Sequence, residues 1–266
     1  MINATHTKKT ILSISHVAVH FGGLVAISDM TFDVKEGELV SLIGPNGAGK
    51  KPPHSTSSQG FFATDKWRGA FSRGSASSSQ AARSGRCRTG ADVSKDQSFS
   101  RRTRCSKNVL TGLHRHGRAS AWATLLSLPS VKREEARQRE TVWEILDFIG
   151  IAEYANELGG ALPYGAQRLL GVAVALAANP TLLLLDEPAS GMNPSETADF
   201  MELLSKIRAR GISILLVEHD MPLVMGVSDR IVVLNYGKII ADGPPVAIQQ
   251  NPEVISAYLG HGVKHA

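Results

Sequence analysis

An apolar run that leads directly into a glycine-rich segment, ELVSLIGPNGAGK at residues 38–50, constrains this 266-residue chain most strongly. Short apolar runs bounded by glycine are typical of buried strands, and glycine permits a tight turn after the strand. When a helix follows such a turn, its free backbone N–H groups and its dipole favour a bound phosphate. The segment therefore predicts an α/β fold with a phosphate-binding loop. The loop residues are Gly44, Pro45, Asn46, Gly47, Ala48, Gly49 and Lys50.

The residue after this loop departs from the pattern G-x-x-x-x-G-K-[ST]. Lys51 stands where a Ser or Thr hydroxyl would coordinate Mg²⁺, and it adds positive charge where the metal would bind. Pro52 and Pro53 follow, and proline disrupts the interior of a helix. We therefore expect weak magnesium binding and a weakened helix dipole in the chain as written.

A compositionally distinct block, residues 51–107, follows the loop. It contains 12 of the chain's 29 Lys and Arg but 3 of its 24 Asp and Glu, so it is the source of the net charge of +5. It has 13 serines, one valine and no leucine, isoleucine or methionine. Because such a segment cannot bury enough apolar surface to offset chain entropy, we expect it to be irregular or disordered. Cys87 and Cys105 have neither metal-site nor redox spacing and are interpreted as incidental free thiols.

The sequence on both sides of the block has the hydrophobic pattern of strands and helices. Strand-like runs occupy residues 11–21, 30–34, 38–44, 181–185 and 213–217. Residues 133–157 have apolar side chains at helical spacing, namely Val142, Ile145, Leu146 and Ile149. The runs TLLLL and SILLV are continuous rather than alternating and are separated by a helical stretch, which is typical of a buried parallel sheet.

Polar residues follow these two apolar runs directly. Asp186 and Glu187 end LLLLDEP, where Asp186 could hold a magnesium ion and Glu187 could orient or deprotonate an attacking water. His219 follows SILLV in SILLVEHD and could contact a terminal phosphate. The alternative for each is structural: an acidic strand end occurs in many α/β domains, and a lone histidine is more often a surface or core residue.

Taken in order, these segments resemble the ATP-binding subunit of ABC transporters over residues 10–50 and about 108–260. GPNGAGK resembles the Walker A loop, LLLLDEP the Walker B strand and EHD the switch histidine. Phe21 resembles the aromatic residue that stacks on adenine, LPYGAQR (162–168) the signature motif, and Ser190–Asn193 the D-loop. GLVAISDMTF and the C-terminal VLNYGKIIADGPPVAIQQNPEVISAYLG resemble the branched-chain amino acid importer branch.

The resemblance implies a P-loop NTPase fold with a mainly parallel core sheet, an N-terminal antiparallel β subdomain and a helical subdomain at about residues 108–162. A nucleotide-binding domain would span residues 10–260, with a tail at 261–266. It implies ATP and Mg²⁺ as cofactors, Glu187 and His219 as catalytic residues and Asp186 as the metal ligand. The implied nucleotide-binding residues are Phe21, the loop Gly44–Lys50, Tyr164, Gly165 and Gln167.

Such subunits pair with an identical or paralogous second ATP-binding subunit beneath transmembrane permease subunits. A periplasmic or extracellular solute-binding protein feeds the permease, so we expect a cytoplasmic chain, peripheral on the inner face of the membrane.

Two segments depart from this family within the matching part. The general signature LSGGQ is replaced by LPYGAQ, which removes a serine hydroxyl, and Gly171 and Val174 stand where relatives typically have Glu and Arg. No counterpart of the Q-loop glutamine is present as written. If the chain is made as written, Lys51 cannot coordinate magnesium, so the charge neutralisation by the metal is lost and hydrolysis should nearly vanish.

Displaced reading frames offer one explanation of the block. Back-translating residues 51–61 in a shifted frame permits TTTFNLITGF, which places a threonine directly after Lys50. The other shifted frame permits LRPTSGEVLFRG from Phe62 and GLARTFQ around residues 88–95, and normal sequence resumes at Asn108. We therefore hypothesise compensating frameshifts, either errors in the recorded sequence or real lesions in the gene.

Two other functional classes stay open at this point. Lys51 and the missing glutamine would suit a catalytically dead nucleotide-binding scaffold or a pseudogene product. The basic block could suit a nucleic-acid-associated ATPase, although it lacks interleaved aromatic residues for base stacking, and we expect no nucleic-acid partner. The N-terminus is too often interrupted by Ser and His for a signal peptide, and no run approaches the roughly 20 apolar residues that span a bilayer. The transported solute cannot be identified from this subunit.

Overall fold

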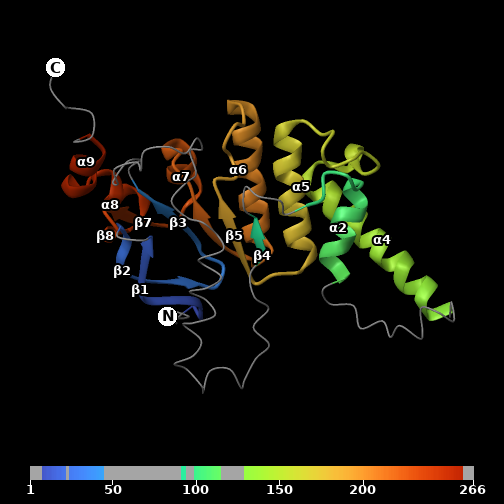
Figure 1. Ribbon diagram of the computed structural model, residues 1–266, viewed down its shortest axis with the longest axis horizontal. Helices are drawn as coiled ribbons and strands as arrows, with labels where there is room; N and C mark the ends of the chain where they lie inside the picture. Colours follow the sequence, from blue (N-terminus) through green and yellow to red (C-terminus); the bar gives the residue numbers. More distant parts are fainter. Residues whose placement is uncertain (1–7, 22–23, 45–90, 94–98, 115–128, 260–266) are drawn as a thin grey trace, which may run out of the picture. The chain divides into compact units, whose positions relative to one another are not determined.

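The structure, a computed structural model, describes residues 8–21, 24–44, 91–93, 99–114 and 129–259 (Figure 1). The chain divides into two compact units. Unit 1 comprises residues 1–87 and 204–266, and unit 2 comprises residues 88–203.

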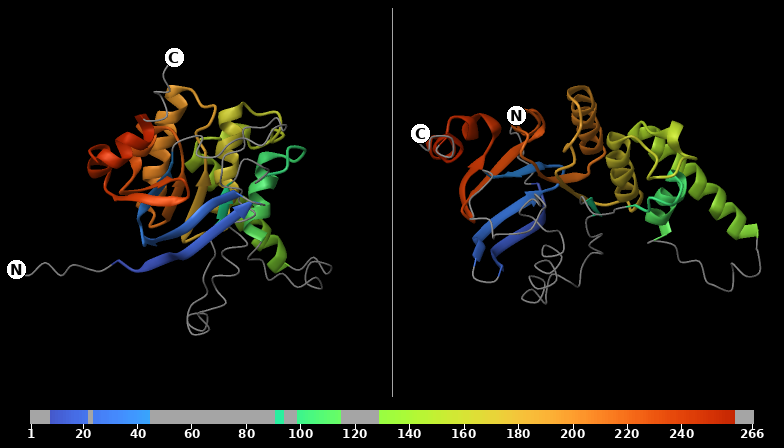
Figure 2. Two further views of the ribbon diagram at one scale, coloured as in Figure 1. Left: turned by 60° about the vertical axis from the view of Figure 1, so that its left-hand side comes forward. Right: turned by 45° about the horizontal axis from the view of Figure 1, so that its top comes forward.

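Unit 1 contains a mixed sheet whose strands lie in the order β1-β2-β8-β7-β3-β6. The strands are β1 (Thr10–Phe21), β2 (Leu24–Lys35), β3 (Leu39–Ile43), β6 (Ser213–Val217), β7 (Arg230–Asn235) and β8 (Lys238–Gly243). β1 and β2 form an antiparallel hairpin, and β7 and β8 form another (Figure 2). The antiparallel N-terminal strands are therefore confirmed.

The centre of this sheet is β3, which pairs parallel with β6 on one side and β7 on the other. All five residues of β3 are buried. Continuous apolar sequence is required because both faces and both edges of the strand are covered. The predicted parallel core is therefore confirmed.

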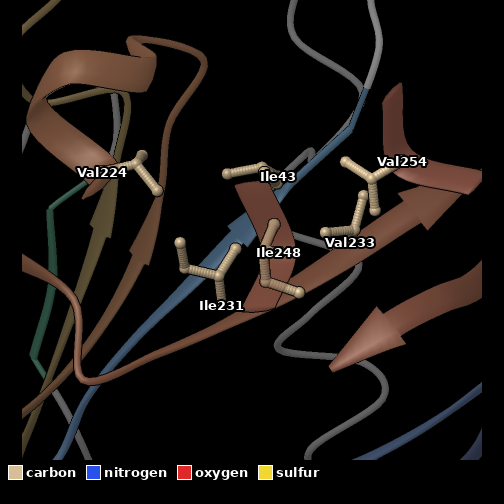
Figure 3. Packing of buried hydrophobic residues seen from close by; sticks show 6 residues of the cluster. All are labelled: Ile43, Val224, Ile231, Val233, Ile248 and Val254. Carbon is tan, nitrogen blue, oxygen red and sulfur yellow. The ribbon is translucent and has the colours of Figure 1, made fainter. Parts of the chain in front are cut away.

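One face of this sheet is covered by three short helices near the C-terminus. They are α7 (Met221–Val227), α8 (Pro245–Gln249) and α9 (Pro252–Leu259). Figure 3 shows Val224 of α7, Ile248 of α8 and Val254 of α9 gathered beside Ile43 and two β7 residues. The last residue of β3 is thus packed against the C-terminal helices.

Arg230 at the start of β7 joins three acidic side chains of unit 1. Its Nε donates to Glu38 Oε1 at 2.8 Å, and its other nitrogens bond Asp242 at 2.9 Å and Asp33 at 3.3 Å. Burial lowers the pKa of the guanidinium, but the Glu38 and Asp242 carboxylates outweigh this and raise its pKa overall. The arginine therefore fastens β2 and β8 to β7.

Unit 2 combines a two-stranded parallel pair with helices. Its elements are β4 (Ala91–Val93), α2 (Cys105–His114), α4 (Pro129–Ile149), the 3₁₀ helix η3 (Ala152–Tyr154), α5 (Tyr164–Ala177), β5 (Leu182–Asp186) and the start of α6 (Pro194–Ala209). α2, α4 and α5 pack together (Figure 2). On α4, Val142, Leu146 and Ile149 are buried as predicted, and Ile145 is half-buried.

The end of the basic block is more regular than its composition predicts. β4 pairs with Leu183–Leu185 of β5, and α2 begins at Cys105. Cys105 is fully buried, and burial raises the pKa of its thiol, so it is a core residue rather than an incidental one. The reason is partly local, since the buried Asn108 bonds the backbone of Ser100, Thr103 and Arg104 and closes this turn. It is also tertiary, since the N–H groups of Cys105 and Ser106 donate to the carbonyls of Glu157 and Ala155, both at 2.9 Å. Residues 51–90, including Cys87, and residues 94–98 lie outside the described residues.

Within the described part of the chain, the helices are too short or too polar to cross a membrane.

Candidate functional site

The predicted site residues are divided between the two units. Unit 1 carries Phe21, the phosphate loop and His219, whereas unit 2 carries Asp186, Glu187 and the signature segment. Phe21 is the last residue of β1 and pairs with Leu24 across the hairpin. Pro45–Lys50 and Lys51 lie outside the described residues, so their predicted roles stay predictions.

Gly44 follows β3 at the point where the predicted loop begins. A Cβ atom at this position would lie 2.8 Å from the carbonyl oxygen of Leu234 on β7. That atom belongs to the backbone of a paired strand and cannot move aside cheaply. The close approach of β7 therefore requires glycine here, independently of any ligand.

His219 lies just beyond β6, beside a buried carboxylate. Its backbone N–H donates to Glu218 Oε2 at 3.0 Å, and its Nδ1 lies 3.7 Å from the same oxygen. The Glu218 side chain is 1% exposed, whereas that of His219 is 50% exposed. Asp220 then caps α7 by accepting the N–H of Leu223 at 3.1 Å. The imidazole is thus held at a fixed strand-to-helix turn while its ring reaches solvent.

Asp186 and Glu187 lie at the carboxyl end of β5, where functional groups gather in parallel sheets. Both are half-buried. Glu187 has a φ of +44°, a left-handed conformation that is uncommon for a residue with a side chain. Its carbonyl accepts the N–H of Ser190 at 3.2 Å, which closes a turn after the strand. Strained backbone at a strand end is typical of functional sites.

The signature segment forms the start of α5. Pro163 occupies the N-cap position, and its ring offers no hydrogen-bond acceptor for the first helical N–H groups. The side-chain amide of Gln167 donates to the carbonyl of the buried Leu162 at 2.8 Å, which ties the helix to the residue before its cap. Tyr164 is 47% exposed, and Gly165 is buried.

The first turn of α5 packs against the loop that follows Glu187. A Cβ at Gly191 would lie 2.8 Å from Tyr164 Cε1, and a Cβ at Gly165 would lie 2.9 Å from Glu196 Oε1. The structure therefore brings Tyr164 against Gly191 of the predicted D-loop, Ser190–Asn193, and Gly165 against Glu196 just beyond it.

The helices α2 and α5 approach each other closely at Gly112. A Cβ at Gly112 of α2 would collide with the carbonyl oxygen of Val174 and lie 2.8 Å from Ala177 Cβ. Gly171 is buried on the same helix. Glycine at position 112 therefore lets α2 approach the backbone of α5 closely. Because the Val174 atom in this contact is a backbone carbonyl, nothing in the structure explains the residue types at positions 171 and 174.

Three residues of this region were missed by sequence reasoning. Glu196 could have been found, because Asn193 followed three residues later by Glu is a capping-box pattern. Glu218 lies in the EHD motif, but nothing in the sequence around it predicts that its carboxylate is buried. Arg168, which contacts Tyr164, has no sequence signal of its own.

The described residues contain no cluster of three or more His, Cys, Asp or Glu side chains that could enclose a metal. Mg²⁺ is usually held by one or two carboxylates together with phosphate oxygens rather than by an all-protein cage. Asp186, a half-buried carboxylate at a strand end, fits that requirement.

Comparison with known proteins adds two family matches. The ABC transporter family matches residues 27–190, and the branched-chain amino acid ATP-binding cassette transporter family matches residues 238–264. The chain is 39% identical over 259 residues to the high-affinity branched-chain amino acid transport ATP-binding protein BraF of Pseudomonas aeruginosa, covering 95% of this chain and 98% of that protein. It is 40% identical over 257 residues to LivG of Escherichia coli K12, which carries the same description, covering 94% and 98%.

Solved structures agree in fold. An ATP-binding cassette of an ABC transporter in its ADP conformation has a TM-score of 0.65 at 21% identity, covering 95% of this chain and 99% of that one. A nucleotide-free cassette has a TM-score of 0.66 at 21% identity, covering 94% and 98%. The fold is therefore that of a P-loop ATP-binding cassette. Together with the family match over more than half of its length, this means that the chain belongs to the ABC transporter family of ATP-binding proteins.

Proposed function

We propose that this chain is the ATPase subunit that energises import of branched-chain or related amino acids through a membrane permease. The observation that carries the proposal is the family match at residues 238–264. These residues include β8, α8 and α9, whose buried Ile248 and Val254 pack beside Ile43 at the end of the strand that leads to Gly44. The branch-specific segment is thus part of the core rather than an appended tail.

Each predicted site residue has a role in this proposal. The loop Gly44–Lys50 would bind the phosphates, and Phe21 would stack on adenine. Glu187 would orient or deprotonate the attacking water, and His219 would contact the terminal phosphate. Support comes from the rigid turns that hold Glu187 and His219 at strand ends. Tyr164, Gly165 and Gln167 would meet the nucleotide of a second subunit.

Asp186 would hold Mg²⁺, which, when bound, neutralises charge on the phosphate groups. Lys51 stands where a hydroxyl would complete the ligand set, so the chain as written should bind the metal weakly. Its net rate of hydrolysis should therefore be low unless a threonine follows Lys50.

The proposed partners are two permease subunits, a second ATP-binding subunit and, indirectly, a solute-binding protein. The proposed location is the inner face of the cell membrane. The relatives named above are transport ATPases, so neither the nucleic-acid nor the scaffold alternative gains support from them.

The decisive experiment is reconstitution. The chain and a Lys51→Thr variant are assembled with the permease and binding-protein subunits of the same organism in proteoliposomes, and ATP hydrolysis is measured with and without leucine. We expect leucine-dependent hydrolysis in the variant, greatly reduced in the chain as written and abolished by Glu187→Gln. A rate of ATP hydrolysis that is the same with and without every branched-chain amino acid would overturn the transport assignment.

A further inference from the structure

We propose that Tyr164 and Arg168 are positioning residues: they hold loop 189–193 in place and, through it, the backbone of Glu187. The inference rests on the proposed role of Glu187 as the residue that acts on water. Each contact that carries it lies within unit 2.

The first observation is the fit between Tyr164 and Gly191. An ideal Cβ at Gly191 would lie 2.8 Å from Cε1, 3.3 Å from Cδ1 and 3.5 Å from Cζ of the tyrosine. One edge of the ring therefore rests directly on the glycine backbone. Gly191 also has a φ of +82°, so both its backbone conformation and the adjacent ring of Tyr164 favour glycine at this position.

The second observation is that Arg168 holds the ring from another side. Its guanidinium carbon lies 4.9 Å from the ring centroid, within cation–π range, and its NH2 group donates to the Tyr164 hydroxyl. Nε of Arg168 is buried and has no hydrogen-bond partner among the described residues. A side chain that leaves a buried N–H unsatisfied is placed by its other contacts, which here are those with Tyr164.

The third observation links the loop to Glu187. Ser190 N–H donates to the Glu187 carbonyl at 3.2 Å, and Met192 N–H donates to the Ala189 carbonyl at 3.0 Å. These consecutive turns surround Gly191 and keep Glu187 at its φ of +44°. Displacing Gly191 would loosen both turns and release the strained residue before them.

Burial alone does not account for this arrangement. Tyr164 is 47% exposed, so its ring is not held in place by a hydrophobic core. A partly exposed tyrosine ordinarily samples several rotamers, whereas this one is fixed by Arg168 on one side and Gly191 on another. We therefore assign the pair to loop positioning.

A matched pair of glycines tests the contact. Gly191 and Gly211 have φ values of +82° and +81°, but a Cβ at Gly211 would meet nothing within 4 Å. Gly191→Ala and Gly211→Ala thus introduce the same backbone strain. Only the methyl group at position 191 also collides with the ring of Tyr164. We expect Gly191→Ala to raise the unfolding constant at least about tenfold more than Gly211→Ala, which corresponds to ~1.4 kcal/mol. Adding Tyr164→Ala to Gly191→Ala should bring that excess close to zero.

Amide hydrogen exchange of the chain as it exists tests the positioning. Tyr164→Ala and Arg168→Ala should speed exchange of Ser190 and Met192 at least about tenfold, while the amides of Leu183–Leu185 in β5 stay protected as in the parent. Tyr164→Phe keeps the ring on Gly191 but loses the hydroxyl acceptor, so it should give a smaller increase. Arg168→Lys should not rescue, since lysine has no planar guanidinium to stack and donate together. Tyr236→Ala, at an exposed tyrosine of unit 1, is the control.

Turnover in the Lys51→Thr background separates the two proposals. Arg168→Ala should lower kcat for ATP with little change in KM, because Glu187 acts on the chemical step. Hydrolysis in the Lys51→Thr parent that does not respond to any branched-chain amino acid would refute the proposed function, and hydrogen exchange would still decide the positioning. The positioning role would be overturned if the exchange rates of Ser190 and Met192 were unchanged in both alanine variants. It would also be overturned if the two glycine substitutions lowered the free energy of unfolding equally.

Discussion

Asn193 and Glu196 cap the first turn of α6 reciprocally. Asn193 Oδ1 accepts the N–H of Glu196 at 2.9 Å, and Glu196 Oε2 accepts the N–H of Asn193 at 2.8 Å. This capping box fixes the Glu196 carboxylate, whose other oxygen faces Gly165 at the start of α5. The predicted D-loop and the predicted signature segment are thereby connected within one unit.

Replacing Asn193 by alanine should destabilise the protein by about 1 kcal/mol, because the backbone N–H of Glu196 loses its side-chain acceptor. Urea unfolding followed by circular dichroism measures the change. Ser195→Ala, at an exposed position in the same turn, is the matched control and should stay within about 0.5 kcal/mol of the parent. Equal effects of the two substitutions would contradict the capping role.

The sequence predicted the parallel core and the helical face of α4 because both depend on local hydrophobic pattern. LVSLI and the first four residues of SILLV are buried on adjacent strands, and Val142, Leu146 and Ile149 face the interior. Their apolar character alone decides where they lie, so a periodicity argument suffices.

The sequence could not predict features that depend on tertiary partners. The start of α2 is fixed by the carbonyls of Glu157 and Ala155, which accept the N–H groups of Cys105 and Ser106, and β4 pairs with β5. The contact between Tyr164 and Gly191 joins residues 27 positions apart, which no local pattern encodes. The predicted roles of Gly44–Lys50, Asp186 and His219 rest on motif order and stay predictions.

Replacing Arg230 by alanine should destabilise the protein by about 3 kcal/mol. The substitution leaves the buried Glu38 carboxylate without its cationic partner, and an uncompensated buried charge is costly. Arg230→Lys should recover only part of the loss, since lysine cannot reach Asp33, Glu38 and Asp242 together. Denaturant unfolding gives both values.

Arg208 provides the comparison for Arg230. Its ion pair with Asp229 at 2.9 Å joins side chains that are 41% and 38% exposed. Because exposed pairs contribute little, Arg208→Ala should cost less than about 1 kcal/mol. A larger loss for Arg208→Ala than for Arg230→Ala would show that burial of Glu38 is not the deciding factor.

Tyr258 should make folding stability depend on alkaline pH. Burial against the core cluster raises the pKa of its phenol to about 12 from 10.0. The unfolded chain therefore loses this proton first, so the stabilisation is fully present below pH 10 and is lost as pH rises towards 12. After allowance for partial solvent exposure, the loss amounts to roughly 1–2 kcal/mol.

The measurement for Tyr258 is urea unfolding at pH 8, 10 and 11.5 of the parent and of Tyr258→Phe. The phenylalanine variant lacks the ionisable group, so the difference between the two proteins isolates this one titration from those of lysines and other tyrosines. We expect the parent's free energy of unfolding to fall more steeply. Parallel pH profiles would show that the phenol does not contribute.

Replacing Lys51 by threonine should raise magnesium-dependent ATP hydrolysis by roughly a hundredfold or more. The substitution supplies the missing hydroxyl ligand and removes a positive charge from the metal's position, and loss of metal stabilisation is worth several kcal/mol in the transition state. Hydrolysis is measured by phosphate release with and without EDTA. Lys107→Thr, which removes an exposed lysine on α2, controls for the change in net charge. If Lys51→Thr hydrolyses no faster than the parent, the other altered residues of block 51–107 must also prevent catalysis. Resequencing codons 45–110 then decides the origin of the block: a restored frame with threonine after Lys50 predicts full activity, whereas the frame as written predicts an inert chain.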